Sequence, residues 1–327
     1  MDYFIRPEKQ KDFYRIAEIN ALAFASFIEN PSERSFIAEV MLVDSLRHSA
    51  NFDPDLALVA EWKGEVVGYA LFTPYSVWVG GVEQKAVSLA PLTVDPKMQK
   101  MGVGAALMEQ GHAIARDKGF EFAFLLGHTE YYPRFGYQTG MFGPYVLDVS
   151  ISDIPEGEFD LVEREVRCGD IPNLVGMWHT WFDDVDLALF PGDSLLDWIS
   201  HCEKIISTVL VKDDEVLGYI RYVAGDAGDV KLFLARDEKA VLQVLRFLAE
   251  KAKKSEHTIL HLPIHSGSAC VRDWIKIPFT VQKSVWEAAM ICLLDEQNLV
   301  VKSYIDQVRN GSRIQGLLMY PPQVEFA

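Results

Sequence analysis

The chain has 327 residues and carries 31 Lys and Arg against 47 Asp and Glu, a formal net charge of −16 at neutral pH. This length is enough for two domains with hydrophobic cores. The acidic balance argues against nucleic acid or an anionic membrane as partner, because a general negative field repels both. The same field would attract a cationic amine, although surface acidity is also an ordinary means of solubility.

The N-terminus and the cysteines predict a cytoplasmic protein. Residues 1–7 lack the basic region and the apolar run of a signal peptide. No stretch approaches the roughly 20 consecutive apolar residues that a membrane span needs, so no membrane partner is expected. The cysteines have no close spacing, which favours free thiols in a reducing compartment: Cys168, Cys202, Cys270 and Cys292.

The first half of the chain alternates strand and helix patterns, with tight turns at Lys63-Gly64 and Gly80-Gly81. Apolar residues recur at spacings of three and four in the helical segments, and short apolar runs mark the strands. The expected elements are a strand at 3–6, a helix at 13–24, strands at 57–62, 66–75 and 87–94, a helix from Val103 to the stop signal Lys118-Gly119, and a strand at 122–126.

A glycine loop separates the strand 87–94 from the helix that follows it. Gly102 and Gly104 let the backbone close around an anion, and the helix directs its free N–H groups and positive dipole end at that anion. The loop lacks the Lys and Ser or Thr of a kinase P-loop. Leu107 replaces the third glycine of a dinucleotide fingerprint. A glycine pair can also serve only to let helix and strand pack closely.

Two motifs together resemble the GNAT superfamily of acetyl-CoA-dependent N-acetyltransferases. Residues 99–105 fit its acyl-CoA loop, which is Gln or Arg, two residues, Gly, one residue, and Gly or Ala. Further on, Tyr132 stands four residues before Gly136-Tyr137, as in many members of the superfamily. The resemblance covers residues 87–140 and extends more loosely back to Met1. It implies an α/β (α+β) fold with a mixed, mostly antiparallel sheet flanked by helices.

The resemblance also implies how acetyl-CoA, the acyl donor, is held. Backbone amides of the loop would bind the pyrophosphate, and the strand before it would pair with the pantetheine arm. This requires strands 87–94 and 122–126 to diverge, and Pro91 is compatible with an interrupted ladder. An N–H near the end of the first strand would polarise the thioester carbonyl. The cofactor-binding residues expected are Leu92, Thr93, Val94, Gln99, Lys100, Met101, Gly102, Val103, Gly104 and Ala105.

The expected reaction is direct attack of a primary amine on the thioester, with expulsion of a thiolate. Tyr132 is the predicted general acid for that thiolate, because a phenol with a pKa near ~10 keeps its proton at neutral pH. Tyr132 could instead be a core residue, and Tyr131 is the second choice. No general base is assigned, since each polar residue near the expected pocket also fits a solvated surface: Glu29, Glu33, His128 and Glu130.

The second half reads as a diverged copy of the first. Breakers and acids between 150 and 160 separate a catalytic domain, 1–152, from a GNAT-like and non-catalytic domain, 160–327. Residues 65–69 recur as 215–219, followed by a similar order of strands at 230–234 and 258–262 around a helix. The glycine loop is missing, and the carboxylates of residues 235–239 would repel a phosphate. A sterol-carrier-like domain is the alternative.

Three other features carry weaker indications. The His257, His261 and His265 spacing falls on a strand, so no metal site is expected. The acidic run Asp183, Asp184 and Asp186 reads as a solvated turn. In some related multidomain acetyltransferases the terminal carboxylate enters the active site as a base, and the tail 320–327 could dock similarly or be disordered.

The sequence therefore favours an N-acetyltransferase acting on a small-molecule or peptide amine, possibly as a homo-oligomer. A non-catalytic acyl-CoA sensor or binding module would share the cofactor loop but needs no acid. A purely structural protein would bind no CoA. The acceptor itself is set by variable loops, so the sequence does not identify it.

Overall fold

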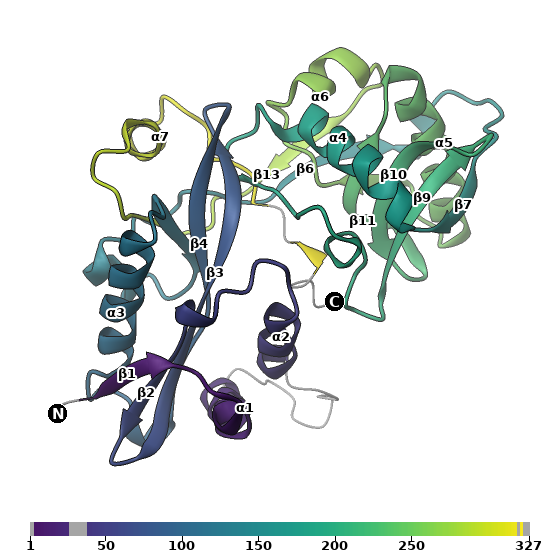
Figure 1. Ribbon diagram of the computed structural model, residues 1–327. Helices are drawn as coiled ribbons and strands as arrows, with labels where there is room; N and C mark the ends of the chain where they lie inside the picture. Colours follow the sequence, from purple (N-terminus) through teal and green to yellow (C-terminus); the bar gives the residue numbers. More distant parts are fainter. Residues whose placement is uncertain (1–2, 26–37, 319–320, 323–327) are drawn as a thin grey trace. The chain divides into compact units, whose positions relative to one another are not determined.

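The computed structural model describes residues 3–25, 38–318 and 321–322, and these form two compact units (Figure 1). Unit 1 comprises Met1–Ser76, Gln84–Thr139 and Glu287–Asp306. Unit 2 comprises Val77–Glu83, Gly140–Trp286 and Gln307–Ala327. Among the described residues, no helix is long and apolar enough to cross a membrane.

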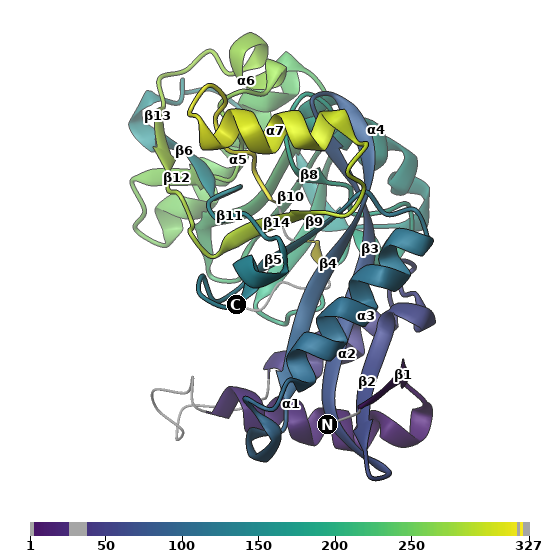
Figure 2. The ribbon, with the colours of Figure 1, turned by 90° about the vertical axis from the view of Figure 1, so that its left-hand side faces the viewer.

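Unit 1 is built on a mixed sheet with the strand order β1-β2-β3-β4-β5-β14. The pairing of β4 with β5 is parallel, whereas β1–β2, β2–β3 and β5–β14 are antiparallel. Figure 2 shows β14 beside β5. The strands are β1 (Phe4–Pro7), β2 (Ala57–Trp62), β3 (Glu65–Val79), β4 (Val82–Val94), β5 (Phe122–Leu126) and β14 (Ala289–Leu293).

Helix α3 covers one face of this sheet, and α1 and α2 cover the other (Figure 1). Leu107 and Met108 on the apolar side of α3 are fully buried in the core with residues of the sheet. Short 3-10 turns join the elements, at Gln10–Asp12 (η1), Pro54–Leu56 (η4), Pro96–Met98 (η5) and Tyr132–Phe135 (η6). The helices are α1 (Phe13–Phe24), α2 (Ala38–Arg47), α3 (Val103–Asp117) and most of α7 (Leu299–Arg309).

Unit 2 repeats this order, with its sheet running β7-β9-β10-β11-β12-β6-β13. Again one neighbouring pair, β11 and β12, is parallel. Its strands are β6 (Tyr145–Ser150), β7 (Val162–Glu165), β9 (Ile205–Lys212), β10 (Glu215–Val223), β11 (Asp226–Ala235), β12 (Ile259–Leu262) and β13 (Thr280–Lys283), and β8 (Ala188–Leu189) pairs with the end of β3. Its helices are α4 (Ile171–Phe182), α5 (Glu238–Lys254) and α6 (Ala269–Trp274), with 3-10 turns η7 (Ile151–Asp153), η8 (Cys168–Asp170) and η9 (Leu195–Asp197).

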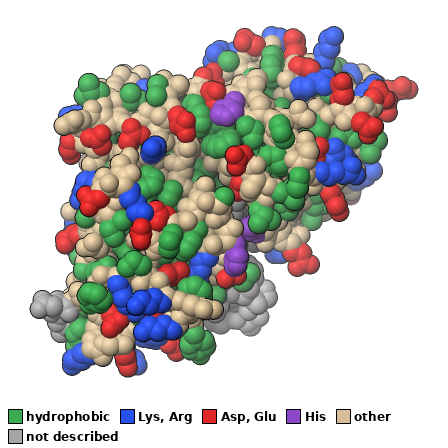
Figure 3. Space-filling view, in the orientation of Figure 1, with side chains coloured by type: hydrophobic (Ala, Val, Ile, Leu, Met, Phe, Trp, Pro, Cys, Tyr) green, Lys and Arg blue, Asp and Glu red, His purple; other side chains and the backbone are tan. Residues whose placement is uncertain are grey.

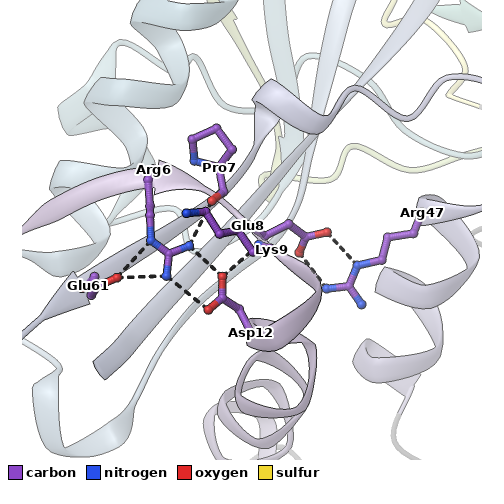
Figure 4. Close-up of polar contacts among 7 residues, drawn as sticks. All are labelled: Arg6, Pro7, Glu8, Lys9, Asp12, Arg47 and Glu61. Atoms are coloured by element: carbon purple, nitrogen blue, oxygen red, sulfur yellow. Dashed lines mark hydrogen bonds and ion pairs between the residues drawn. The ribbon is translucent and has the colours of Figure 1, made fainter. Parts of the chain in front are cut away.

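Unit 1 opens with a charged cap that fixes β1 to α1 (Figure 4). The Arg6 guanidinium donates to Asp12 at 2.6 Å and to Glu61 at 2.9 Å. Asp12 also accepts from the Lys9 backbone N–H at 2.8 Å, which satisfies a free amide at the helix start. The hydrogen bond from Arg6 lowers the pKa of the Asp12 carboxyl. Nearby, Arg47 of α2 donates to Glu8 at 2.7 and 2.8 Å.

Unit 2 has the same kind of cap between β7 and α4. Arg164 donates to Asp170 at 2.7 and 2.8 Å, and Asp170 accepts from the Arg167 backbone N–H at 2.8 Å. The hydrogen bond from Arg164 lowers the pKa of the Asp170 carboxyl. Arg164, Arg167 and Asp170 have the same spacing as Arg6, Lys9 and Asp12. The same strand–turn–helix pattern therefore occurs in both units.

A pair of glycines supports the same correspondence. A Cβ at Gly68 would lie 2.7 Å from Val103 and 3.2 Å from the Thr93 carbonyl oxygen. A Cβ at Gly218 would lie 2.6 Å from Val244 and 3.1 Å from the Leu234 carbonyl oxygen. Each glycine therefore lets its strand approach a helix and the next strand closely. The repeat favours a GNAT-like second unit over the sterol-carrier-like alternative.

The α+β fold class and the strands and helices predicted for the first half are confirmed, with boundaries shifted by a few residues. The compact units are nevertheless not collinear with the predicted domains 1–152 and 160–327. The strand that follows η6, β6, pairs with β12 in unit 2, whereas β14 comes from late in the chain and pairs with β5 in unit 1. The division into a catalytic and a non-catalytic domain stays a prediction.

Candidate active site

The candidate site begins where β4 and β5 separate. Their parallel pairing covers Ala86–Phe122, Val87–Ala123 and Ser88–Phe124 and then stops, although both strands continue. β5 itself continues to Leu126, paired with β14 on its other side. Among the described residues, β4 from Leu89 to Val94 therefore has no strand partner on the side of β5. The predicted divergence is confirmed. An open ladder edge can accept an extended, amide-containing ligand as a strand is accepted.

The end of β4 is fixed by polar contacts from within unit 1. The Thr93 hydroxyl donates to the Asn20 side chain of α1 at 2.7 Å, and both residues are buried. The Asp95 backbone N–H donates to the Val67 carbonyl at 2.9 Å, and its carboxylate forms an ion pair with Arg15. Burial opposes ionisation, but hydrogen bonds from the Lys97 amide and Arg15 lower the pKa of Asp95 below its ordinary value. These contacts hold the unpaired backbone in place.

The glycine loop leads directly into α3. Gly102 is the N-cap residue with φ +92°, and Lys100 also has a positive φ, +62°. The first helical hydrogen bond runs from Ala106 N–H to the Gly102 carbonyl at 3.0 Å. The amides of Val103–Ala105 therefore lie in the turn that an α-helix leaves without internal acceptors. Together with the helix dipole, they offer a site for an anionic group.

Tyr131 lies against this first turn. A Cβ at Gly104 would come within 2.6 Å of the Tyr131 Oη and 3.7 Å of Val94. The Arg134 guanidinium stacks 4.4 Å from the centre of the Tyr131 ring and donates to the Tyr131 carbonyl at 3.1 Å. Sequence reasoning named Tyr131 only as a second choice for the acid. Its place beside the loop depends on a contact between residues 27 positions apart, which no local pattern indicates.

Tyr132, the predicted acid, begins η6 and lies at the opposite end of β5 from the parallel pairing. Its ring packs on Gly127, where a Cβ would come within 2.2 Å of Cε2. Its edge meets the Tyr137 ring, with centroids 5.8 Å apart at 70°. Burial raises the pKa of Tyr132 to about 12, so the phenol keeps its proton at neutral pH. The ring thus packs against the core as the alternative reading expected, while its protonation state suits an acid.

The residues considered for the base are placed differently. Glu29 and Glu33 lie outside the described residues. His128 and Glu130 are exposed in the turn between β5 and η6, where the His128 carbonyl accepts from the Tyr131 N–H at 3.0 Å. None of the described residues is therefore assigned as base. On the face shown in Figure 3, acidic and basic side chains are interspersed, so on that face the charge is not gathered in one patch.

The corresponding place in unit 2 has a carboxylate at the helix start. Asp237 is the N-cap of α5, and its side chain accepts from the Ala240 N–H at 2.9 Å, as the sequence predicted. The Trp181 indole N–H donates to the Ala235 carbonyl at the end of β11 at 2.8 Å. That indole packs against Phe233 and Trp274. Asp237 thus caps a first-turn amide of α5, and the Trp181 indole takes the carbonyl at the end of β11.

The histidines and acidic residues of unit 2 have separate partners. His257 contacts Asp226 at 2.6 Å, His261 contacts Asp148 at 2.7 Å, and the described residues contain no cluster suited to a metal ion. The prediction of a solvated turn is wrong for Asp186. Its carboxylate accepts two bonds of 2.7 Å from Arg313 and one of 2.8 Å from the Gly80 amide. Of the tail, only Pro321 and Pro322 lie within the described residues from 320 onward.

Comparison with known proteins gives matches over the same region. Residues 5–140 match the model of the acetyltransferase (GNAT) domain. The uncharacterized N-acetyltransferase YjhQ of Escherichia coli K12 is 39% identical over 104 residues, which are 32% of this chain and 57% of that protein. The uncharacterized N-acetyltransferase YhbS of the same strain is 35% identical over 102 residues, 31% of this chain and 59% of that protein. The chain thus spans less than two thirds of these relatives.

A solved structure extends the likeness to both units. The GCN5-related N-acetyltransferase from Anabaena variabilis aligns with 90% of this chain and 73% of its own length, with a TM-score of 0.65 and 15% sequence identity. At that identity the similarity concerns the fold alone.

Proposed function

We propose that the chain transfers an acetyl group from acetyl-CoA to a primary amine, because residues 5–140 match the model of the acetyltransferase (GNAT) domain. The observation that carries this proposal is the separation of β4 from β5 directly before a glycine loop at a helix start. The proposal assigns the donor site to the backbone of Leu92–Val94 and to the loop 99–105.

Each part of this site has a chemical task. The amides of residues 102–105 would bind the pyrophosphate of acetyl-CoA, since they are free N–H groups at the positive end of α3. The open edge of β4 would pair with the amide groups of the pantetheine arm. An N–H near Val94 would donate to the thioester oxygen as negative charge develops there.

The transfer itself needs one new bond and one broken bond. The amine nitrogen attacks the thioester carbon and forms a C–N bond, and collapse of the tetrahedral intermediate breaks the C–S bond. Tyr132 gives its proton to the departing thiolate, and the amine loses a proton to solvent or to a base not assigned among the described residues. The phenol regains its proton from water. The acceptor is a small-molecule or peptide amine, and the second unit carries no transfer chemistry of its own.

Two measurements test the proposal. Calorimetric titration with acetyl-CoA should show binding, and CoA release should accelerate with one of four amine classes: an aminoglycoside, a polyamine, an amino acid or a peptide N-terminus. Tyr132→Phe should lower kcat about 100- to 10,000-fold with little change in the Kd of acetyl-CoA, the size of effect usual for a general acid. Tyr219→Phe, which removes a buried hydroxyl of unit 2, is the matched control. Tight binding without transfer to any amine would favour a non-catalytic acyl-CoA module instead.

A further inference from the structure

The turn that carries Tyr132 is short and has few hydrogen bonds of its own. η6 has four residues, and its closing bond runs from the Gly136 N–H to the Pro133 carbonyl at 3.1 Å. A 3-10 turn of this length has few internal hydrogen bonds, and their geometry is poorer than in an α-helix. The direction of the Tyr132 hydroxyl therefore depends on the groups packed around the turn.

On the β5 side, Gly127 supplies the space for the ring. Its missing side chain is filled by Tyr132, with Cε2 and Cδ2 at 2.2 and 2.8 Å from where a Cβ would stand. The Gly127 N–H donates to the Ala288 carbonyl at 2.9 Å, which anchors this backbone to the segment that leads into β14. A methyl group at this position could be accommodated only by displacing the Tyr132 ring.

On the α3 side, Tyr137 ties the turn to the helix that begins with the cofactor loop. Its hydroxyl and the His112 Nε2 lie 3.0 Å apart, and both side chains are buried. The Tyr137 ring in turn supports the edge of Tyr132. The Tyr132–Tyr137 ring contact and the Tyr137–His112 hydrogen bond thus connect the proposed acid with the helix whose first turn would hold the donor phosphates.

The third support comes from β14. The Cys292 thiol donates to the Phe135 carbonyl of η6 at 3.3 Å. Ile291 exchanges two backbone bonds with Gln138, at 2.8 and 3.1 Å, directly after the turn. Burial raises the pKa of Cys292 to about 12, so the thiol keeps the proton that it donates.

We propose that Gly127 and Tyr137, the latter through its bond to His112, are positioning residues that aim the Tyr132 hydroxyl at the departing sulfur. This inference rests on the proposed function. It assigns neither residue a contact with substrate. Both act on the reaction only through the hydroxyl of Tyr132, and this makes the inference testable.

A double-mutant cycle on the full chain separates positioning from general damage. Gly127→Ala and Tyr137→Phe are each made alone and together with Tyr132→Phe, which keeps the ring but removes the hydroxyl. Alone, each should lower kcat about 10-fold and change the Kd of acetyl-CoA less than about twofold. Combined with Tyr132→Phe, neither should lower kcat further. The assay is CoA release with the most active amine among the four classes.

Tyr219→Phe is the matched control, because it removes a buried hydroxyl that donates to the Trp198 carbonyl at 2.7 Å in unit 2. It should leave kcat unchanged. If Tyr137→Phe does not fold, as thermal unfolding would show, Gly127→Ala alone decides the question.

Three results would overturn the inference, and each has a different meaning. Equal losses of kcat with and without the Tyr132 hydroxyl would mean that Gly127 and Tyr137 act through general stability. An active Tyr132→Phe variant with unchanged kcat would remove the acid that they are said to aim. Binding of acetyl-CoA without turnover on any amine by the unaltered protein would refute the proposed function itself, and the positioning role with it.

Discussion

Replacement of Gly102 by alanine tests whether the backbone conformation of the loop is needed to bind acetyl-CoA. Gly102 has φ +92°, and among the described residues no heavy atom outside its immediate chain neighbourhood lies within 4 Å of a Cβ built there. Gly64, in the turn between β2 and β3, has φ +84° and equally open surroundings. The two substitutions therefore impose the same backbone strain without a steric clash, and only one of them is at the proposed site.

The expected cost in stability is nearly the same for both. A left-handed conformation costs an L-residue about 1–2 kcal/mol. Alanine also reduces the conformational entropy of the unfolded chain, which offsets this cost by about 0.4–1 kcal/mol. The free energy of unfolding should therefore fall by about 1 kcal/mol in Gly102→Ala and in Gly64→Ala, as urea denaturation would measure.

The two variants should differ in binding. Relief of the strain at residue 102 turns the amides that begin α3, so we expect the Kd of acetyl-CoA to rise about tenfold, which corresponds to about 1.4 kcal/mol. Gly64→Ala should leave that Kd unchanged. The measurement is calorimetric titration at one salt concentration. Equal Kd values for Gly102→Ala and the unaltered protein would refute the argument that these amides bind the pyrophosphate.

Other predictions concern stability. Asp12→Asn and Asp170→Asn should each lower the unfolding free energy at neutral pH by about 1–3 kcal/mol. Because the pKa values of both carboxyls are lowered in the folded protein, this difference should disappear as acid protonates them, and urea denaturation at several pH values checks this. Burial lowers the pKa of His112 to about 4 in the folded protein, against about 6.5 in the unfolded chain. The free energy of unfolding should therefore fall by about 3 kcal/mol as the pH drops from about 6.5 to about 4, and His112→Gln should reduce this dependence on pH. Asp186→Asn should cost about 1–3 kcal/mol by thermal unfolding, because the Arg313 fork and the Gly80 amide lose their charged acceptor.

Local signals in the sequence were sufficient for the elements around the site. The stripe of α3 and its stop at Lys118-Gly119 fix that helix within its observed bounds, and Asp95-Pro96 ends β4 where expected. The cap of α5 by Asp237 follows equally from residue type and position. These predictions succeed because propensity, periodicity and capping depend on neighbours in the chain.

Contacts between distant segments could not be read in this way. β14 pairs with β5 across more than 160 residues, and nothing in the pattern of residues 289–293 distinguishes this edge from another. The same limit applies to the Tyr131 hydroxyl beside Gly104 and to Asp186, whose partners Gly80 and Arg313 lie far away in the sequence. Such pairings follow from shape and burial in the folded chain rather than from local preference.

The late arrival of β14 has a consequence for synthesis on the ribosome. When a nascent chain has emerged only as far as η6, β5 is complete but its side opposite β4 has no neighbour. Such an edge can capture strands of other chains. Until residues 287–293 leave the exit tunnel, this half-finished sheet depends on chaperones or on rapid translation. Slowing elongation while residues 170–290 are being added should therefore increase aggregation of the newly made protein, whereas slowing it before residue 120, when β5 has not been made, should not.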